Sequence, residues 1–161
     1  MKKKNNLIII CVLITIILYF LFAYTLERTQ FYRFLGLYAF LFTGYFYFIK
    51  KQAKDVSFLT SISILFRLVF LFSIPNLSQD FYRFIWDGRM ILEGFNPYLS
   101  LPETFINQHS LPVNQAVELY NGMGELNGSH YTNYPPINQL CFFLAAVFAN
   151  KSILGSVIVM R

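Results

Sequence analysis

The chain has 161 residues, of which 56% are hydrophobic and only 13% are charged. A soluble domain carries about a quarter charged residues, so this composition excludes an ordinary water-soluble domain and favours a protein embedded in lipid. The formal charge of +5 is concentrated in lysine clusters and accompanies no nucleic-acid-binding motif, so we expect no nucleic-acid partner. The two cysteines and two histidines do not have the spacing of a metal site, and we expect neither a metal nor another cofactor.

Apolar runs separated by short polar segments predict an all-α chain that crosses the membrane several times as a polytopic helix bundle. The first run, residues 7–25, is longer than the apolar core of a signal peptide, which spans about 7–15 residues, and no A-x-A-like cleavage site follows it. We therefore expect a retained membrane anchor. The next runs cover residues 35–49 and 56–74.

Lysine clusters before the first run and between the second and third predict the orientation. Cytoplasmic loops of membrane proteins are enriched in lysine and arginine, so residues 2–4 and 50–54 should lie in the cytoplasm. This places the N-terminus inside and residues 76–132 outside, in one long extracytoplasmic loop.

Arg67 falls within the third predicted span. A charge inside the bilayer is costly, so we expect Arg67 to face a partner helix, a water-filled cavity or an anionic ligand. Snorkelling of its side chain to the membrane surface is the simpler alternative.

The outer loop begins with a predicted helix over residues 78–93. Ser78 is a suitable N-cap, Gly94 a suitable stop, and Pro97 prevents continuation. One stripe of this helix is apolar, which favours an amphipathic helix that lies along the membrane surface or packs on the bundle. The stripe consists of Phe81, Phe84, Ile85, Gly88 and Leu92.

Charged residues line the edge of that stripe. Asp80, Arg83 and Asp87 recur at helical spacing, so Arg83 lies between two carboxylates. Tyr82, Trp86 and Arg89 share the opposite side, where tyrosine and tryptophan suit a water–lipid boundary. An exposed ladder of weak ion pairs explains the same pattern without any site.

The loop ends at Tyr134-Pro135-Pro136, which opens a fourth apolar run over residues 137–149. A polar turn follows, and a further run begins at residue 153. Because a span needs about 20 apolar residues, we interpret residues 1–161 as a single transmembrane domain at the N-terminal end of a longer protein.

Two blocks of this chain resemble the signature of bacterial multi-span mannosyltransferases of the GT-C class. The first block comprises residues 78–84 (SQDFYRF), 86–89 (WDGR) and 94–98 (GFNPY). The second is Tyr134-Pro135-Pro136 with Gln139. Enzymes of this class take sugars from polyprenyl-phosphate donors.

The resemblance implies a glycosyltransferase in the bacterial cytoplasmic membrane. It would move a sugar, mannose by analogy, from a polyprenyl-phosphate donor in the bilayer to a hydroxyl of a glycan or lipid acceptor on the extracytoplasmic side. Asp80 would be the general base that activates this hydroxyl. The resemblance implies substrate contacts for Arg67, Arg83, Trp86, Asp87, Arg89, Tyr98 and Tyr134.

Within that set, Arg83 or Arg89, together with Arg67, would hold the donor phosphate, and Asp87 would orient Arg83 or bind sugar hydroxyls. Trp86, Tyr82 and Tyr98 would form a sugar-stacking or interfacial wall. Two other classes stay open: a transporter-like polytopic membrane protein, and a non-catalytic remnant of a glycosyltransferase.

Overall fold

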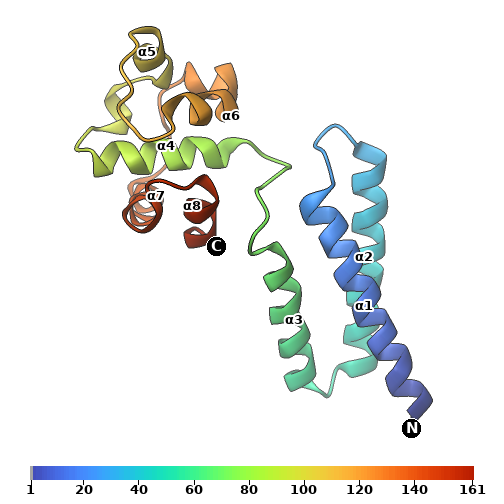
Figure 1. The fold of residues 1–161 in the computed structure, drawn as a ribbon. Coiled ribbons are helices and arrows are strands. Elements are labelled where there is room, and N and C mark those ends of the chain that lie inside the picture. Colours follow the sequence, from blue (N-terminus) through green and yellow to red (C-terminus); the bar gives the residue numbers. More distant parts are fainter. Residues whose placement is uncertain (1) are drawn as a thin grey trace. The chain divides into compact units, whose positions relative to one another are not determined.

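The computed structural model describes residues 2–161, which are helical without any strand in that range (Figure 1). The chain divides into two compact units, Met1–Leu77 and Ser78–Arg161. The structure thus divides the stretch that the sequence analysis treats as one transmembrane domain, and each unit is described by itself.

Unit 1 contains three helices, α1 (Lys2–Tyr24), α2 (Phe31–Gln52) and α3 (Val56–Phe70). Among the described residues, only Asn6–Tyr24 within α1 is both long and apolar enough to cross a membrane. The third run was predicted to continue to residue 74, but α3 ends at Phe70. Its 15 residues span about 22 Å, short of the roughly 30 Å of a bilayer core.

Aromatic side chains join the three helices of unit 1. The ring of Tyr19 on α1 lies 5.2 Å from that of Phe66 on α3 and 5.6 Å from that of Phe70. Phe48 on α2 contacts Phe66 from the other side, with ring centroids 6.2 Å apart. At the α3 end, the Tyr24 hydroxyl donates a hydrogen bond to the Val69 carbonyl at 3.0 Å.

Unit 2 corrects the prediction of a long loop with a single helix. It is built from α4 (Asp80–Leu92), the 3-10 turn η1 (Pro97–Leu99), α5 (Pro102–Asn107), α6 (Ala116–Gly128), α7 (Pro136–Ala149) and α8 (Ile153–Val159). In Figure 1, α4 runs through the middle of this unit, with α5 and α6 on one side and α7 and α8 on the other.

The helix predicted to lie on the membrane surface is therefore the core helix of unit 2. Phe81, Ile85, Trp86 and Met90 of α4 are all less than 10% exposed and pack with residues such as Leu119 of α6. The apolar stripe was correctly predicted to be a packing face. The opposite side was wrongly expected to be exposed, because α5 and α6 were not predicted and they cover it.

The C-terminal end of α4 follows the predicted signal, whereas the N-terminal prediction is wrong, because the N-cap is Gln79 rather than Ser78 and makes no side-chain cap bond. Gly94 adopts a left-handed backbone with φ of 83°, and its N–H donates to the Ile91 carbonyl at 3.0 Å while the Phe95 N–H donates to the Met90 carbonyl at 2.8 Å. This arrangement ends the helix as a glycine cap does. At the other end, Ser78 Oγ accepts from the Asp80 N–H at 3.2 Å, and the helix begins at Asp80.

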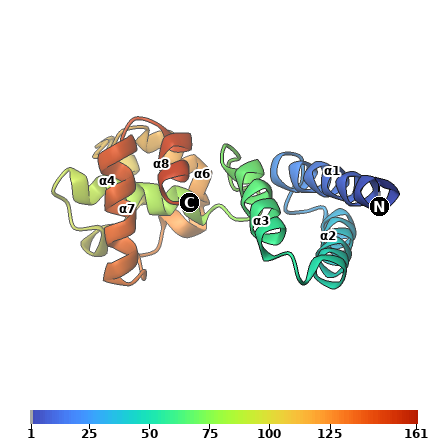
Figure 2. The ribbon, with the colours of Figure 1, turned by 90° about the horizontal axis from the view of Figure 1, so that it is seen from below.

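Gly88 permits the close crossing of α4 and α7, which is visible in Figure 2. A Cβ at residue 88 would lie only 2.1 Å from the carbonyl oxygen of Phe142 and 2.4 Å from its carbon. Both atoms belong to the backbone, so no side-chain rotation could relieve the overlap. A residue without a side chain is required here for the two helices to pack.

We predict that Gly88→Ala destabilises the protein by about 3 kcal/mol, because α4 and α7 must move apart to admit the methyl group. Thermal unfolding in detergent micelles, followed by circular dichroism, measures the effect. Gly36→Ala on α2 is the control, since no atom lies within 4 Å of the added Cβ, and it should not destabilise. An equal loss in both variants would contradict the role assigned to Gly88.

Candidate functional site

A buried ion pair lies at the centre of unit 2. Arg83 Nε donates to Asp87 Oδ1 at 2.8 Å, and the two residues are 3% and 0% exposed. The pair lies one helical turn apart on α4, as the spacing predicted. It is not the exposed ladder of the simpler interpretation, because Asp80 makes no ion pair with Arg83 among the described residues and the pair itself is closed to solvent.

Arg83 and Asp87 also bind the segments that pack against α4. Arg83 Nη1 donates to the carbonyls of Asn127 at 2.6 Å and His130 at 2.9 Å. Asp87 Oδ2 accepts from Gln139 Nε2 at 2.9 Å. The same amide lies 3.3 Å from Thr132 Oγ1, so one network fixes the end of α6, the segment after it and the start of α7.

A hollow of about 260 Å³ lies directly beside this network. Its wall consists of Arg83, Leu126, Asn127, His130, Tyr131, Thr132, Asn133 and Tyr134. Most of these side chains carry hydrogen-bonding groups, and a hollow of this character suits a small polar ligand such as a sugar. Arg83 Nη2 makes no hydrogen bond within the described chain, so this N–H group is available to such a ligand.

Asp80 lies in the first turn of α4 and is bonded to Asn127, one of the residues that line this hollow. It is half-buried, and its Oδ1 accepts a hydrogen bond from Asn127 Nδ2 at 3.3 Å. Burial raises the pKa of Tyr134, and the negative charges of Asp80 and Asp87 raise that pKa further against the opposing effect of Arg83. The Asp80 carboxylate therefore interacts with two residues that line the hollow, Asn127 through a hydrogen bond and Tyr134 through its charge.

A hydrogen bond joins Tyr98 to Tyr134, and Tyr134 also lines the hollow. The Tyr98 hydroxyl donates to the Tyr134 carbonyl at 2.5 Å, which joins η1 to the start of α7. The Tyr134 ring packs edge-on against Phe84, with centroids 4.8 Å apart. The contact of either tyrosine with a substrate stays a prediction.

Trp86 and Arg89 do not face this hollow. Trp86 is 1% exposed within the apolar core, so it cannot form the boundary wall that was predicted. Arg89 is fully buried, and it donates to the Asn114 carbonyl at 2.5 Å and to Gln115 Oε1 at 3.2 Å. Burial lowers the pKa of Arg89 to about 10, with Glu118 acting in the opposite direction.

The guanidinium of Arg89 thus holds the loop before α6, where Gln115 has a left-handed backbone with φ of 57°. The structure places Arg89 away from the hollow, and its role in binding the donor phosphate stays a prediction. Arg67 lies in unit 1, in the last turn of α3, and its Nη1 donates to Ser63 Oγ at 3.1 Å.

Three contributors to the network were missed by sequence reasoning. Asn127, His130 and Thr132 lie in the segment that was predicted to be a loop. Gln139 was singled out by the resemblance alone. No group of three or more metal-binding side chains comes together within residues 2–161.

Comparison with known proteins adds no relative. No protein-family model matches the chain, and neither a curated protein nor a solved structure is similar to it. The membership of a glycosyltransferase class accordingly stays a proposal that rests on the two sequence blocks.

We predict stability effects of very different size for two isosteric substitutions on α4. Asp87→Asn leaves the buried Arg83 charge unpaired and should destabilise unit 2 by about 3–5 kcal/mol. Asp80→Asn, at a half-buried position outside any ion pair, should change stability by less than about 1 kcal/mol. Denaturant unfolding followed by fluorescence measures both, since Trp86 is the only tryptophan and lies in the core of this unit. Similar losses in the two variants would show that the buried pair is not the stronger interaction.

Proposed function

We propose that this chain belongs to a polytopic membrane glycosyltransferase, which moves a sugar from a polyprenyl-phosphate donor to an acceptor hydroxyl on the extracytoplasmic side. One observation carries the proposal. Of the two aspartates in the first sequence block, Asp87 is locked in a buried ion pair, whereas Asp80 is half-buried and accepts a hydrogen bond from Asn127, a residue that lines a polar hollow.

The membrane placement is supported by composition and by the helices. The window Asn6–Tyr24 of α1 is apolar enough to span a bilayer, and α3 and α7 are shorter apolar helices. The lysine clusters favour a cytoplasmic N-terminus. A donor with a polyprenyl tail requires this arrangement, because its tail stays in lipid while its sugar phosphate lies at the surface.

The proposed reaction assigns one proton transfer to Asp80. Its carboxylate accepts the proton of the acceptor hydroxyl as the oxygen forms a bond to the anomeric carbon of the sugar. The bond between that carbon and the phosphate oxygen breaks, and its electron pair leaves with the polyprenyl phosphate. Asn127 holds the Asp80 carboxylate through its amide, which leaves the second carboxylate oxygen for the acceptor.

Arg83 supports the same reaction in two ways. Its Nε and Nη1 hold the walls of the hollow, and its Nη2 is available for a hydrogen bond to the leaving phosphate or to a sugar hydroxyl. A hydrogen bond from a charged N–H donor becomes stronger as negative charge develops on the leaving group. Asp87 orients the Arg83 guanidinium through the hydrogen bond between the two side chains.

We predict that Asp80→Asn lowers sugar transfer by about 10²–10⁴-fold, because asparagine keeps the shape of the side chain but cannot accept the proton. Transfer from a radiolabelled polyprenyl-phosphate sugar, in membranes that contain the protein, measures the rate. Glu93→Gln, at an exposed carboxylate just after the same helix, is the matched control and should leave the rate unchanged.

Near-normal transfer by a correctly inserted Asp80→Asn variant would remove Asp80 from the reaction. Absence of transfer from any polyprenyl-phosphate sugar by the wild-type protein, under conditions in which a known enzyme of the class is active, would overturn the proposed function itself.

A further inference from the structure

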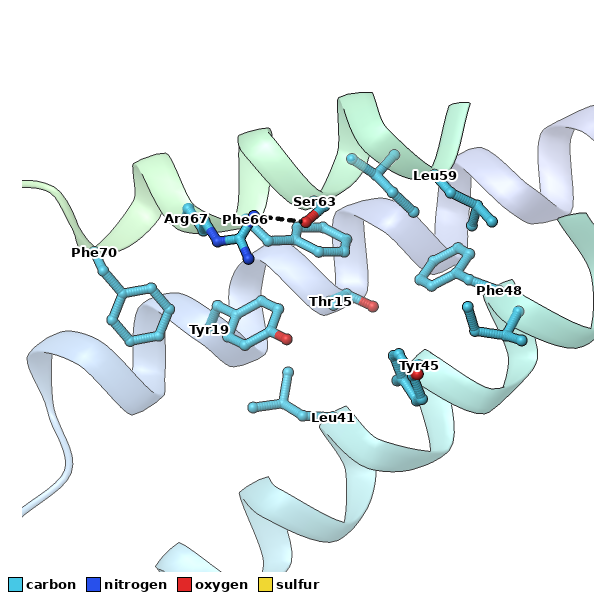
Figure 3. A pocket seen from close by; sticks show the side chains of 12 residues that line it. Thr15, Tyr19, Leu41, Tyr45, Phe48, Leu59, Ser63, Phe66, Arg67 and Phe70 are labelled. Atoms are coloured by element: carbon cyan, nitrogen blue, oxygen red, sulfur yellow. Dashed lines mark hydrogen bonds between the residues drawn. The ribbon is translucent and has the colours of Figure 1, made fainter. Parts of the chain in front are cut away.

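A second cavity lies within unit 1, and the proposed transfer reaction does not use it. It has a volume of about 370 Å³ and opens between α1, α2 and α3. Figure 3 shows its walls, with Thr15 and Tyr19 from α1, Leu41, Tyr45 and Phe48 from α2, and Ser63, Phe66 and Arg67 from α3. Aliphatic and aromatic side chains make up most of this lining, and Arg67 is its one charged member.

Arg67 has no anionic partner among the described residues. Its hydrogen bond to Ser63 Oγ, at 3.1 Å, is to a neutral hydroxyl one turn earlier on α3. The ion pair of Arg83 and Asp87 lies in unit 2 and does not involve Arg67. A cation on an apolar membrane helix is costly unless an anion or water compensates it, and the exposed Arg67 can pair with a negative group that enters this cavity.

The position of Arg67 along α3 indicates which anion it meets. Arg67 lies in the last turn of the helix, at the end that the lysine clusters assign to the outer side. That end of α3 points toward the outer leaflet, and the long side chain of Arg67 can extend from it toward the phosphates there. From Arg67 the cavity continues along α3 to Leu59, eight residues or about 12 Å toward the other end of the helix.

The shape of the cavity favours a hydrocarbon chain over a protein helix. An α-helix with its side chains is about 10 Å across, and a segment of such a helix does not fit a cavity of about 370 Å³. Part of a single acyl chain can lie along Phe66, Ile62 and Leu59, with the head of the lipid at Arg67. A phospholipid therefore satisfies both the charge and the apolar wall.

We propose that this cavity holds one acyl chain of an anionic phospholipid of the outer leaflet, whose phosphate accepts hydrogen bonds from Arg67 and Ser63. The inference rests on the membrane placement of unit 1 in the proposed function, but not on the transfer reaction. The lipid is a bound constituent of unit 1 rather than a substrate.

Native mass spectrometry of the detergent-purified protein tests the proposal with three added lipids: phosphatidylglycerol, diacylglycerol with the same acyl chains, and a polyprenyl monophosphate. We expect one phosphatidylglycerol to remain bound per chain, while diacylglycerol, which lacks the phosphate, is lost. Arg67→Gln should weaken phosphatidylglycerol retention at least tenfold, whereas Ser63→Phe should abolish it by filling the cavity.

Arg33→Gln is the control, because Arg33 is an exposed arginine of the same unit whose bonds go to Thr25 and Gln30, and it should retain the lipid. Equal retention of diacylglycerol and phosphatidylglycerol by the wild-type protein would overturn the proposal, even if no variant folds. So would undiminished retention by folded Arg67→Gln. Exclusive binding of the polyprenyl monophosphate would also overturn it and would assign the cavity to the donor. Because this assay measures binding only, its failure is distinct from a failure of sugar transfer.

Discussion

A guanidinium and a carboxylate that are almost fully buried must satisfy most of their charges and hydrogen bonds within the protein, because little water reaches them. Arg83 and Asp87 meet this requirement by binding each other and by recruiting two carbonyls and one amide from segments 40 or more residues later in the chain. The pair thereby dictates where the end of α6 and the start of α7 lie around α4. The hollow beside Asp80 exists because these segments are held in that position.

The crossing of α4 and α7 depends on the same region. Gly88 is the neighbour of Asp87, and its missing side chain lets the α7 backbone approach α4 closely enough for Gln139 to reach the carboxylate. One short stretch therefore provides the charge and the contact surface, and the half-buried Asp80 lies two turns before Asp87. Asp87 and Gly88 of the first sequence block thus build the frame of unit 2, whereas Asp80 is outside the buried ion pair.

Local features of the fold were predictable from the sequence. The glycine stop at Gly94, the helix before it and the apolar face of that helix all follow from spacing and backbone preference. The burial of Trp86 and Arg89 was not predictable, because it depends on α6, whose two internal glycines, Gly122 and Gly124, hide its helical pattern. Gly124 departs from helical geometry with φ of 75°, and only tertiary contacts hold this segment together.

The candidate site, like the fold, could be predicted from the sequence only in its local features. The spacing of Arg83 and Asp87 predicted their ion pair, but the choice between an exposed ladder and a buried network depends on partners that approach from Asn127, His130 and Gln139. The observed position of Arg67 differs from the predicted one for a simpler reason. The apolar run continues past the helix, so an arginine expected well inside a span lies in the last turn of α3.

The central claim is that the buried pair of Arg83 and Asp87 organises unit 2, and a double-mutant cycle tests it most directly. Arg83→Met, Asp87→Ala and the double variant would be unfolded in denaturant, with Trp86 fluorescence as the probe. The account predicts a coupling energy of about 2–3 kcal/mol, because each single variant leaves the other group buried without its partner. A coupling energy of only about 0.2–1 kcal/mol, as found for exposed pairs, would contradict it.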